Sequence, residues 1–226
     1  MAILLKTFGF ISFCADFAPL FFLVWKYKLL KQNVYKLLLL WTIISVTLDI
    51  IIILYTDTKN QQMYALINII LEPLFVLMIY SLLIHQKIFK YIFASVAIVF
   101  VALAYFSIKQ DGIYIFNNNL AAGAVFMILL CTLTVFFRMF FNSPDQLVLY
   151  NPKVFLVLGY MIYTSGTFFL FALTDTFPNM FVNPGLWIFF IVANTAKNLF
   201  IVKMLLNEIK IIYSKKIKEE LPNLEQ

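Results

Sequence analysis

The sequence predicts an all-α membrane protein, a bundle of seven transmembrane helices, on three observations. Of the 226 residues, 63% are hydrophobic and only 12% are charged, a composition far outside the range of soluble globular domains. Apolar runs of about twenty residues recur along the whole chain, and each is long enough to cross a hydrocarbon core as a helix. Lysine and arginine residues cluster at every second connection between these runs.

The apolar runs define seven predicted spans with short connections, which leave no room for a soluble domain. The spans are 7–26, 37–55, 63–84, 88–107, 117–138, 153–174 and 184–206. The first span holds Asp16 and Pro19 and ends in a basic segment without a small-residue cleavage site, so it reads as a retained helix, not a signal peptide. We therefore expect one seven-helix domain over 1–206 and a basic cytoplasmic tail over 207–226.

The distribution of basic residues predicts the orientation of the bundle. One side of the predicted membrane has only Lys6, Lys59 and Lys109. The other side has thirteen basic residues: Lys26, Lys28, Lys31, Lys36, Lys87, Lys90, Arg138, Lys153, Lys203, Lys210, Lys215, Lys216 and Lys218. The positive-inside rule then places the N-terminus outside and the C-terminus in the cytoplasm, which we expect at the cell inner (cytoplasmic) membrane. The net charge of +6 fits attraction to anionic lipid headgroups of the bilayer, and no basic patch outside the membrane flanks indicates nucleic acid as a partner.

Polar residues inside five of the spans recur at helical spacing, so each set shares one helix face. The sets are Ser12 with Asp16, Ser45 with Asp49, Tyr64 with Asn68 and Glu72, Tyr163 with Thr167, and Asn194 with Lys197 and Asn198. A polar face turned to lipid would leave its groups unpaired at a cost of several kcal/mol. These faces are therefore expected to point into the bundle.

Lys197 is the most unusual of these residues, because it is an ammonium group about thirteen residues from the predicted outer surface. Asp16 and Glu72 lie about ten residues deep and Asp49 about six, which is within one or two helical turns of Lys197. An isolated charge at this depth costs from about 2.5 to more than 10 kcal/mol. We expect Lys197 to pair with one or more of these acids.

Three amides, those of Asn68, Asn194 and Asn198, are placed to satisfy the remaining donors and acceptors of this network. Three roles fit the network at this point: a switching or ligand site, purely structural pairing between helices, or a water-filled pathway. Pro19 follows Asp16 by three residues and Pro73 directly follows Glu72, so the first and third helices are each predicted to kink beside an acid. An acid beside a kink is a candidate cavity wall, although such kinks also serve packing alone.

Motifs of catalysis and of metal binding are absent from the sequence. It has no HExxH, no glycine-rich phosphate loop and one histidine, and both cysteines, Cys14 and Cys131, fall inside predicted spans. We therefore expect no enzyme activity, no metal site and no cofactor.

The last sixty residues resemble a family of small seven-helix membrane proteins of Bacteroidota, whose membrane regions also occur ahead of two-component histidine kinases. The residues that carry the resemblance are 151–155 (NPKVF), 159–171 (GYMIYTSGTFFLF), 186–188 (LWI) and the Asn194-x-x-Lys197-Asn198 element. The resemblance implies a sensory input module and no particular chemistry. We therefore expect a receptor-like or signal-coupling component, with a small ligand among its candidate partners. Unlike the fused members, this sequence shows no kinase region, so its output would pass to a separate two-component kinase or another membrane protein.

Two other functions remain open. A lysine in the seventh span with an acid in the third looks like the Schiff-base arrangement of microbial rhodopsins, in which Lys197 would hold retinal. Against this, the third span lacks the expected arginine and tryptophan, the sixth lacks tryptophan, and position 193 is alanine. The other function is a small-solute or proton-coupled transporter using Asp16 and Glu72, although the matching prolines of a repeat are missing from spans five to seven.

Overall fold

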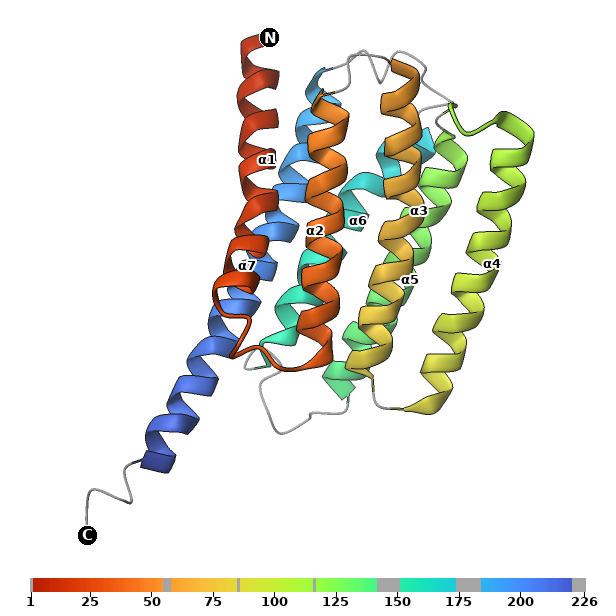
Figure 1. Ribbon diagram of the computed structural model, residues 1–226. Coiled ribbons are helices and arrows are strands. Elements are labelled where there is room, and N and C mark those ends of the chain that lie inside the picture. The colour runs from red at the N-terminus through yellow and green to blue at the C-terminus, as the bar shows by residue number, and fades with distance from the viewer. Residues whose placement is uncertain are drawn as a thin grey trace.

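A computed structural model describes residues 2–54, 58–84, 86–115, 117–141, 151–173 and 184–220. Seven helices account for nearly all of them (Figure 1). They are α1 (Ala2–Trp25), α2 (Asn33–Leu54), α3 (Thr58–Leu83), α4 (Lys87–Asp111), α5 (Asn118–Phe141), α6 (Lys153–Leu173) and α7 (Pro184–Glu220). The all-α fold class is confirmed.

Six of the helices, α2 to α7, are long and apolar enough to cross a membrane. In α1 the segment Phe10–Trp25 forms a shorter apolar stretch. The chain is therefore a multi-pass helical membrane protein. Side chains on its outer faces are apolar, including Phe21, Ile98, Phe137 and Phe169, each more than half exposed. Such residues suit contact with lipid tails, which solvate them as well as a protein interior would.

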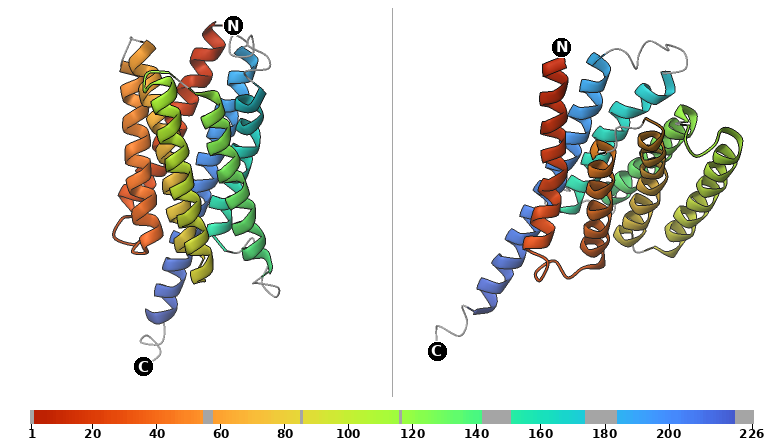
Figure 2. Two further views of the ribbon diagram at one scale, coloured as in Figure 1. Left: turned by 90° about the vertical axis from the view of Figure 1, so that its right-hand side faces the viewer. Right: turned by 45° about the horizontal axis from the view of Figure 1, so that its top comes forward.

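The helices pack in an order that brings the first and last helices together. Helix α7 lies between α1 and α6, while α1 also contacts α2 and α6 also contacts α5. Helix α3 contacts α2, α4 and α5, so that it joins the two halves of the bundle. The views in Figure 2 agree that α1 and α7 run side by side although they are farthest apart in the sequence. Helix α4 lies at the edge, against α3 and α5 (Figure 1).

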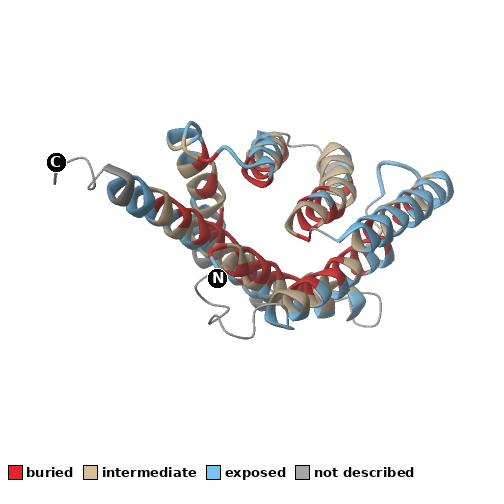
Figure 3. Ribbon diagram, turned by 90° about the horizontal axis from the view of Figure 1, so that it is seen from below, coloured by how far each residue is buried: buried red, intermediate tan, exposed pale blue. Residues whose placement is uncertain are grey.

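Buried residues lie on the sides of the helices that face one another (Figure 3). The larger buried cluster includes Leu38, Tyr80, Tyr160 and Met204, which come from four different helices. A smaller cluster joins α3, α4 and α5. It consists of Leu66, Phe100, Ala104, Leu120 and Ala124. The polar residues of α1, α2, α3, α6 and α7 are positioned against this packing.

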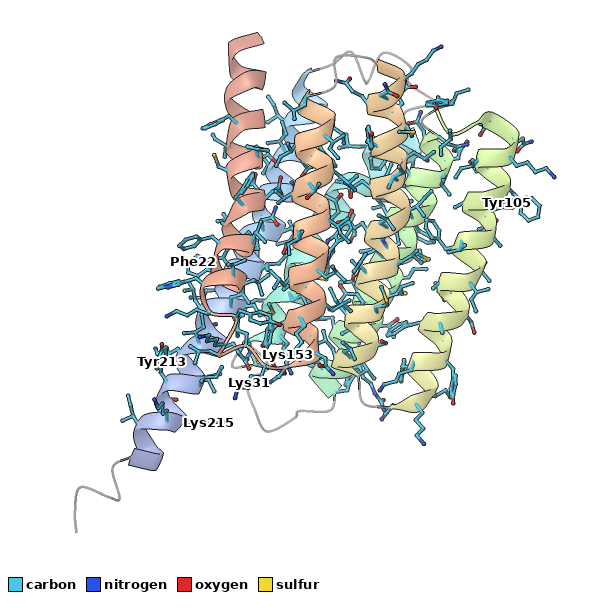
Figure 4. All side chains as sticks on the ribbon, viewed as in Figure 1. Phe22, Lys31, Tyr105, Lys153, Tyr213 and Lys215 are labelled. Carbon is cyan, nitrogen blue, oxygen red and sulfur yellow. The ribbon has the colours of Figure 1, made fainter. Side chains whose placement is uncertain are left out.

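Basic side chains gather at the end of the bundle where the C-terminus emerges. Figure 4 shows Lys31, Lys153 and Lys215 at this end, from three segments that are distant in the sequence. Lys26 lies there too, with its ammonium group 3.9 Å from the ring centroid of Trp25 and 5.7 Å from that of Tyr213 on α7. The N-terminus is at the opposite end (Figure 1).

Helix α7 extends well past the predicted span end at residue 206, because it continues to Glu220 and leaves the bundle (Figure 1). Residues 207–220 of the predicted tail are thus helical, and 221–226 lie outside the described residues. A physical reason is that no glycine or proline interrupts 186–220, so the backbone hydrogen bonds continue beyond the apolar segment. Pro19 and Pro73 both lie inside continuous helices and are buried.

Candidate functional site

An ion pair between α7 and α3 lies at the centre of the candidate site. The Nζ atom of Lys197 donates a hydrogen bond to Oε1 of Glu72 over 3.0 Å. Both residues are buried, with 8% and 7% of their surface exposed. This pairing is one of those expected from the similar depth of the two side chains. A charge pair in a dry interior is tolerated only with close geometry and further hydrogen bonds, so the neighbours of the pair matter.

Two tyrosines of α6 complete the surroundings of the ion pair. The hydroxyl of Tyr163 donates to the second carboxylate oxygen, Oε2 of Glu72, over 3.2 Å. The ammonium of Lys197 lies 4.0 Å from the ring centroid of Tyr163 and 5.5 Å from that of Tyr160. Both oxygens of Glu72 are thus bonded, while the Lys197 charge faces two aromatic rings that attract it. Three helices, α3, α6 and α7, are linked at this point.

Close approach of α6 to α7 positions Lys197 for these contacts. Gly159 of α6 sits against the backbone of α7, where an added Cβ would lie 3.0 Å from the carbonyl oxygen of Lys197 and 3.0 Å from Cβ of Phe200. Small residues at such crossings allow transmembrane helices to approach closely. The missing side chain at 159 therefore sets how deeply Lys197 reaches toward α3.

The second acid, Asp16 of α1, takes different partners from Glu72. Its Oδ1 atom accepts a hydrogen bond from Nδ2 of Asn194 over 3.0 Å and another, shorter one from Nδ2 of Asn198. Asn194 also lies 3.2 Å from the hydroxyl of Ser12. The carboxyl group of Asp16 is therefore held by two amides of α7 and not by the lysine between them.

A cavity of about 380 Å³ opens beside these groups. It is lined by Ser12, Phe13, Asp16, Ser45, Asp49, Ile52, Asn68, Glu72, Tyr163, Phe190, Ile191, Asn194 and Lys197. The lining runs from Lys197 and Glu72 in the middle of the bundle to Ile52 and Phe190, near the ends of α2 and α7 on the side of the N-terminus (Figure 1). A smaller adjoining space of about 20 Å³ is lined by residues that include Asp16, Lys197 and Asn198.

Asp49 and Asn68 share the cavity wall but not the hydrogen-bond network. In the described part of the chain no donor reaches the carboxylate of Asp49, which is half-buried. The Oδ1 atom of Asn68 is buried and likewise has no hydrogen-bond partner among the described residues. The cavity thus contains acceptors that lack donors.

All seven polar residues predicted for the network line one or other of these two spaces. The two prolines of the predicted kinks, Pro19 and Pro73, are not among the lining residues. The aromatic lining, Phe13, Phe190, Tyr160 and Trp41, was not predicted. Helical spacing could have indicated three of these, because each shares a helix face with a predicted polar residue. Phe13 precedes Asp16 by three residues, Phe190 precedes Asn194 by four, and Tyr160 precedes Tyr163 by three.

The acidic side chains of this site are not arranged as a set of metal ligands. Within the described residues, no group of three or more His, Cys, Asp or Glu side chains is arranged to hold a metal ion. Cys14 is exposed and Cys131 is buried, and both are free thiols. The chemistry available in the cavity is therefore hydrogen bonding and charge pairing.

Comparisons with family models, with curated proteins and with solved structures found no match to this chain. Any assignment of function thus rests on the residues of the site and their geometry.

Proposed function

We propose that the chain is a receptor-like or signal-coupling component of the cytoplasmic membrane, with seven spans, an outer N-terminus and a cytoplasmic C-terminus. The observation that carries this proposal is the Lys197–Glu72 ion pair on the wall of a cavity, because it ties α7 to α3 through an interaction that an occupant can disturb. Buried ionisable groups in membrane helices are functional sites by default, since they are costly to retain for packing alone.

The gathering of lysines at the end where α7 emerges supports the orientation. Lys31, Lys153 and Lys215 come together there (Figure 4), and basic residues prefer the cytoplasmic side. The span that would complete the count of seven, beside α2 to α7, is α1. Its full length of 24 residues suffices to cross a hydrocarbon core. In this orientation the cavity extends from the bundle centre toward the outer surface, and α7 projects into the cytoplasm.

Helix α7 is suited to carry a signal from the cavity to the cytoplasm. It continues without interruption from Lys197 to Glu220, which is about 35 Å at the rise of an α-helix. Near its cytoplasmic end Glu208 is buried and its Oε1 accepts a hydrogen bond from Nε2 of Gln32, over 3.3 Å, in the connection between α1 and α2. A ligand, ion or proton that changes the Lys197 pairing would shift α7, and the helix would transmit the shift to its free end.

The projecting end of α7 is the part of the molecule available to a separate partner. Tyr213, Lys215 and Ile217 are exposed there, so the helix presents both basic and apolar side chains beyond the bundle. In line with the resemblance to kinase input regions, the partner would be a two-component kinase or another membrane protein.

The coupling can be measured as a distance between the end of α7 and the bundle. Spin labels at Ser214→Cys and Lys87→Cys, both exposed positions, would report this distance in lipid nanodiscs after Cys14 and Cys131 are replaced. We expect Lys197→Ala and the milder Glu72→Gln and Tyr163→Phe to change the distance distribution. Asp111→Asn, an exposed acid on α4, is the matched control and should leave it unchanged.

The opposite result would remove the basis of the proposal. Suppose that all three core variants fold, as judged by helical content, and keep the spin-label distance distribution of the protein with the unchanged core. In that case the ion pair only holds helices together. Purification of the intact protein in mild detergent would then show independently whether a kinase accompanies it.

A small-solute or proton-coupled transporter is the second candidate, favoured by the three carboxyl groups on the wall of one cavity. Carboxyl groups inside a bundle are the usual proton relays of transporters. Uptake into proteoliposomes that is abolished by Glu72→Gln would favour transport over sensing, whereas a receptor shows no uptake in either form.

A further inference from the structure

We propose that the cavity binds a small organic amine in its protonated form, with the ammonium group held by Asp49. This inference rests on the proposed function, because it names the chemical class of the ligand for the same cavity. Three observations lead to it: the balance of charge, the acceptors without donors, and the aromatic lining.

Carboxyl groups outnumber ammonium groups on the cavity wall. Three carboxyl groups, those of Asp16, Asp49 and Glu72, face one ammonium, that of Lys197. Lys197 is committed to Glu72, and Asp16 is held by the amides of Asn194 and Asn198. Asp49 is left without a donor in the described part of the chain. A carboxylate in a low-dielectric site gains most from a cation, so the vacant position is selective for positive charge.

The unused hydrogen-bonding groups point to a ligand rich in donors. Asp49 offers two carboxylate oxygens, and Asn68 adds a buried Oδ1 without a partner. Buried acceptors are nearly always hydrogen-bonded. A buried acceptor without a donor on a cavity wall therefore indicates an occupant that supplies N–H or O–H groups. A primary ammonium carries three N–H donors and no acceptor, which complements this wall. A carboxylate or phosphate ligand would meet these acceptors with the wrong charge.

Aromatic and aliphatic side chains on the cavity wall can pack against the apolar part of such a ligand. Phe13 and Phe190 line the cavity together with Ile52 and Ile191. Ring faces attract an ammonium and also pack against an apolar body. A volume of about 380 Å³ is at the lower end of small-molecule sites. No group of three His, Cys, Asp or Glu side chains among the described residues is arranged to hold a metal ion, so an organic cation suits the wall better than a metal ion.

An amine in this position would also act on the ion pair. Glu72 lines the same cavity as Asp49, and its Oε1 is the acceptor of Lys197. A second cation near Glu72 competes with Lys197 for that carboxylate and repels its ammonium. Binding would therefore weaken the tie between α7 and α3, which is the shift that the proposed signalling requires.

Three probes that share one ring separate charge from shape: 2-phenylethylamine, which is protonated at neutral pH, 2-phenylethanol, which is neutral, and phenylacetate, which is an anion. Each is titrated into the full chain in lipid nanodiscs by calorimetry. We expect saturable binding of the amine and at least tenfold weaker binding of the alcohol and the anion. In Asp49→Asn, which keeps the shape of the side chain, amine affinity should fall at least tenfold.

Asp111→Asn is the control, since this exposed acid on α4 is remote from the cavity and should leave amine affinity unchanged. Ser45→Ala, which also changes the cavity wall but removes no charge, should lower affinity by much less than Asp49→Asn. A probe that only partitions into the lipid would do so equally in every variant. Its titration would not saturate and would not depend on Asp49.

The inference is overturned if the alcohol binds as well as the amine, if the anion binds best, if none of the probes binds, or if Asp49→Asn has no effect on amine affinity. These failures can be told apart from failure of the proposed function. Without amine binding, a spin-label distance that still responds to Lys197→Ala would preserve signal coupling with another ligand. Conversely, Asp49-dependent binding with an unresponsive α7 would preserve the amine site and remove the signalling role.

Discussion

Helices α4 and α7 are both apolar enough to cross a membrane, yet they occupy opposite environments in this bundle. Along α4 only Phe93, Phe100 and Ala104 are buried among its described residues, and most of the others are exposed (Figure 3). Helix α7 lies between α1 and α6 and buries Lys197, Asn198 and Glu208. Both helices are apolar enough to span, with mean hydropathies of 2.3 for α4 and 1.5 for α7, and they differ in the position of their polar residues.

The contrast follows from the solvent. In a bilayer, apolar side chains gain little by leaving lipid for protein, so an apolar helix such as α4 can remain at the edge. Polar groups cannot face lipid without a large cost, so a helix with mid-span polar residues is drawn into the interior. The basic residues of α4, Lys87, Lys90 and Lys109, lie near its ends, where headgroups and water can reach them.

The largest effect should come from breaking the ion pair that holds α7 inside. Replacing Lys197 by methionine leaves the Glu72 carboxylate buried without its cation, so we expect the free energy of unfolding to fall by about 3–5 kcal/mol. Reversible unfolding in mixed micelles measures this. The control is Lys203→Met, an exposed lysine on the same helix, which should change stability by less than about 0.5 kcal/mol.

A double variant, Lys197→Met with Glu72→Met, sharpens this result. Because it removes both charges, it should recover much of the stability that the single change loses. A Lys197→Met protein as stable as Lys203→Met would mean that the pair contributes nothing to holding α7, and the contrast with α4 would need another cause.

A smaller effect is expected at the contact of α6 with α7. Gly159→Ala places a methyl group 3.0 Å from the backbone of α7, so the helices must move apart and the free energy of unfolding should fall by about 1–3 kcal/mol. Gly123→Ala on α5 is the control, since a Cβ there meets nothing within 4 Å, and it should be neutral or slightly stabilising. Equal stabilities of the two variants in the same unfolding assay would show that the close approach is not required.

The smallest effect should appear on the outer face of α4. Ile98 is 70% exposed and is expected to contact lipid, so Ile98→Ala should change the free energy of unfolding by less than about 0.5 kcal/mol. Leu66→Ala, at a leucine that is 1% exposed in the cluster between α3 and α5, should cost about 2–5 kcal/mol in the same assay. A large loss at Ile98 would show that α4 has a protein partner on this face.

Much of the fold could be predicted from the sequence, because the bilayer imposes one simple requirement. Each stretch of about twenty apolar residues must satisfy its backbone internally, so it becomes a helix. The helix ends were less predictable. For α7 the predicted span ended at 206, but the helix continues to Glu220, since loss of apolar character does not stop a helix when no glycine or proline follows.

The sequence predicted which residues gather at the candidate site, but it did not predict which of them form pairs. Depth along each span brought Lys197, Glu72, Asp16 and Asp49 to a common region, because rise per residue is constant in a helix. The sequence alone left three acids as candidate partners of Lys197. Depth in the membrane does not say which helices are neighbours. The choice among the three acids therefore required the packing of the helices.

By itself, then, the sequence determined the all-α class, the apolar segments and the polar character of five helix faces. Only the tertiary structure decided that Lys197 pairs with Glu72, that Asp16 is held by two amides, and that Asp49 faces a cavity without a donor. The physical reason lies in the rotation of each helix about its axis and in its neighbours, which are set by packing contacts between helices, such as that of Gly159 against α7. Those contacts join residues that are far apart in the chain.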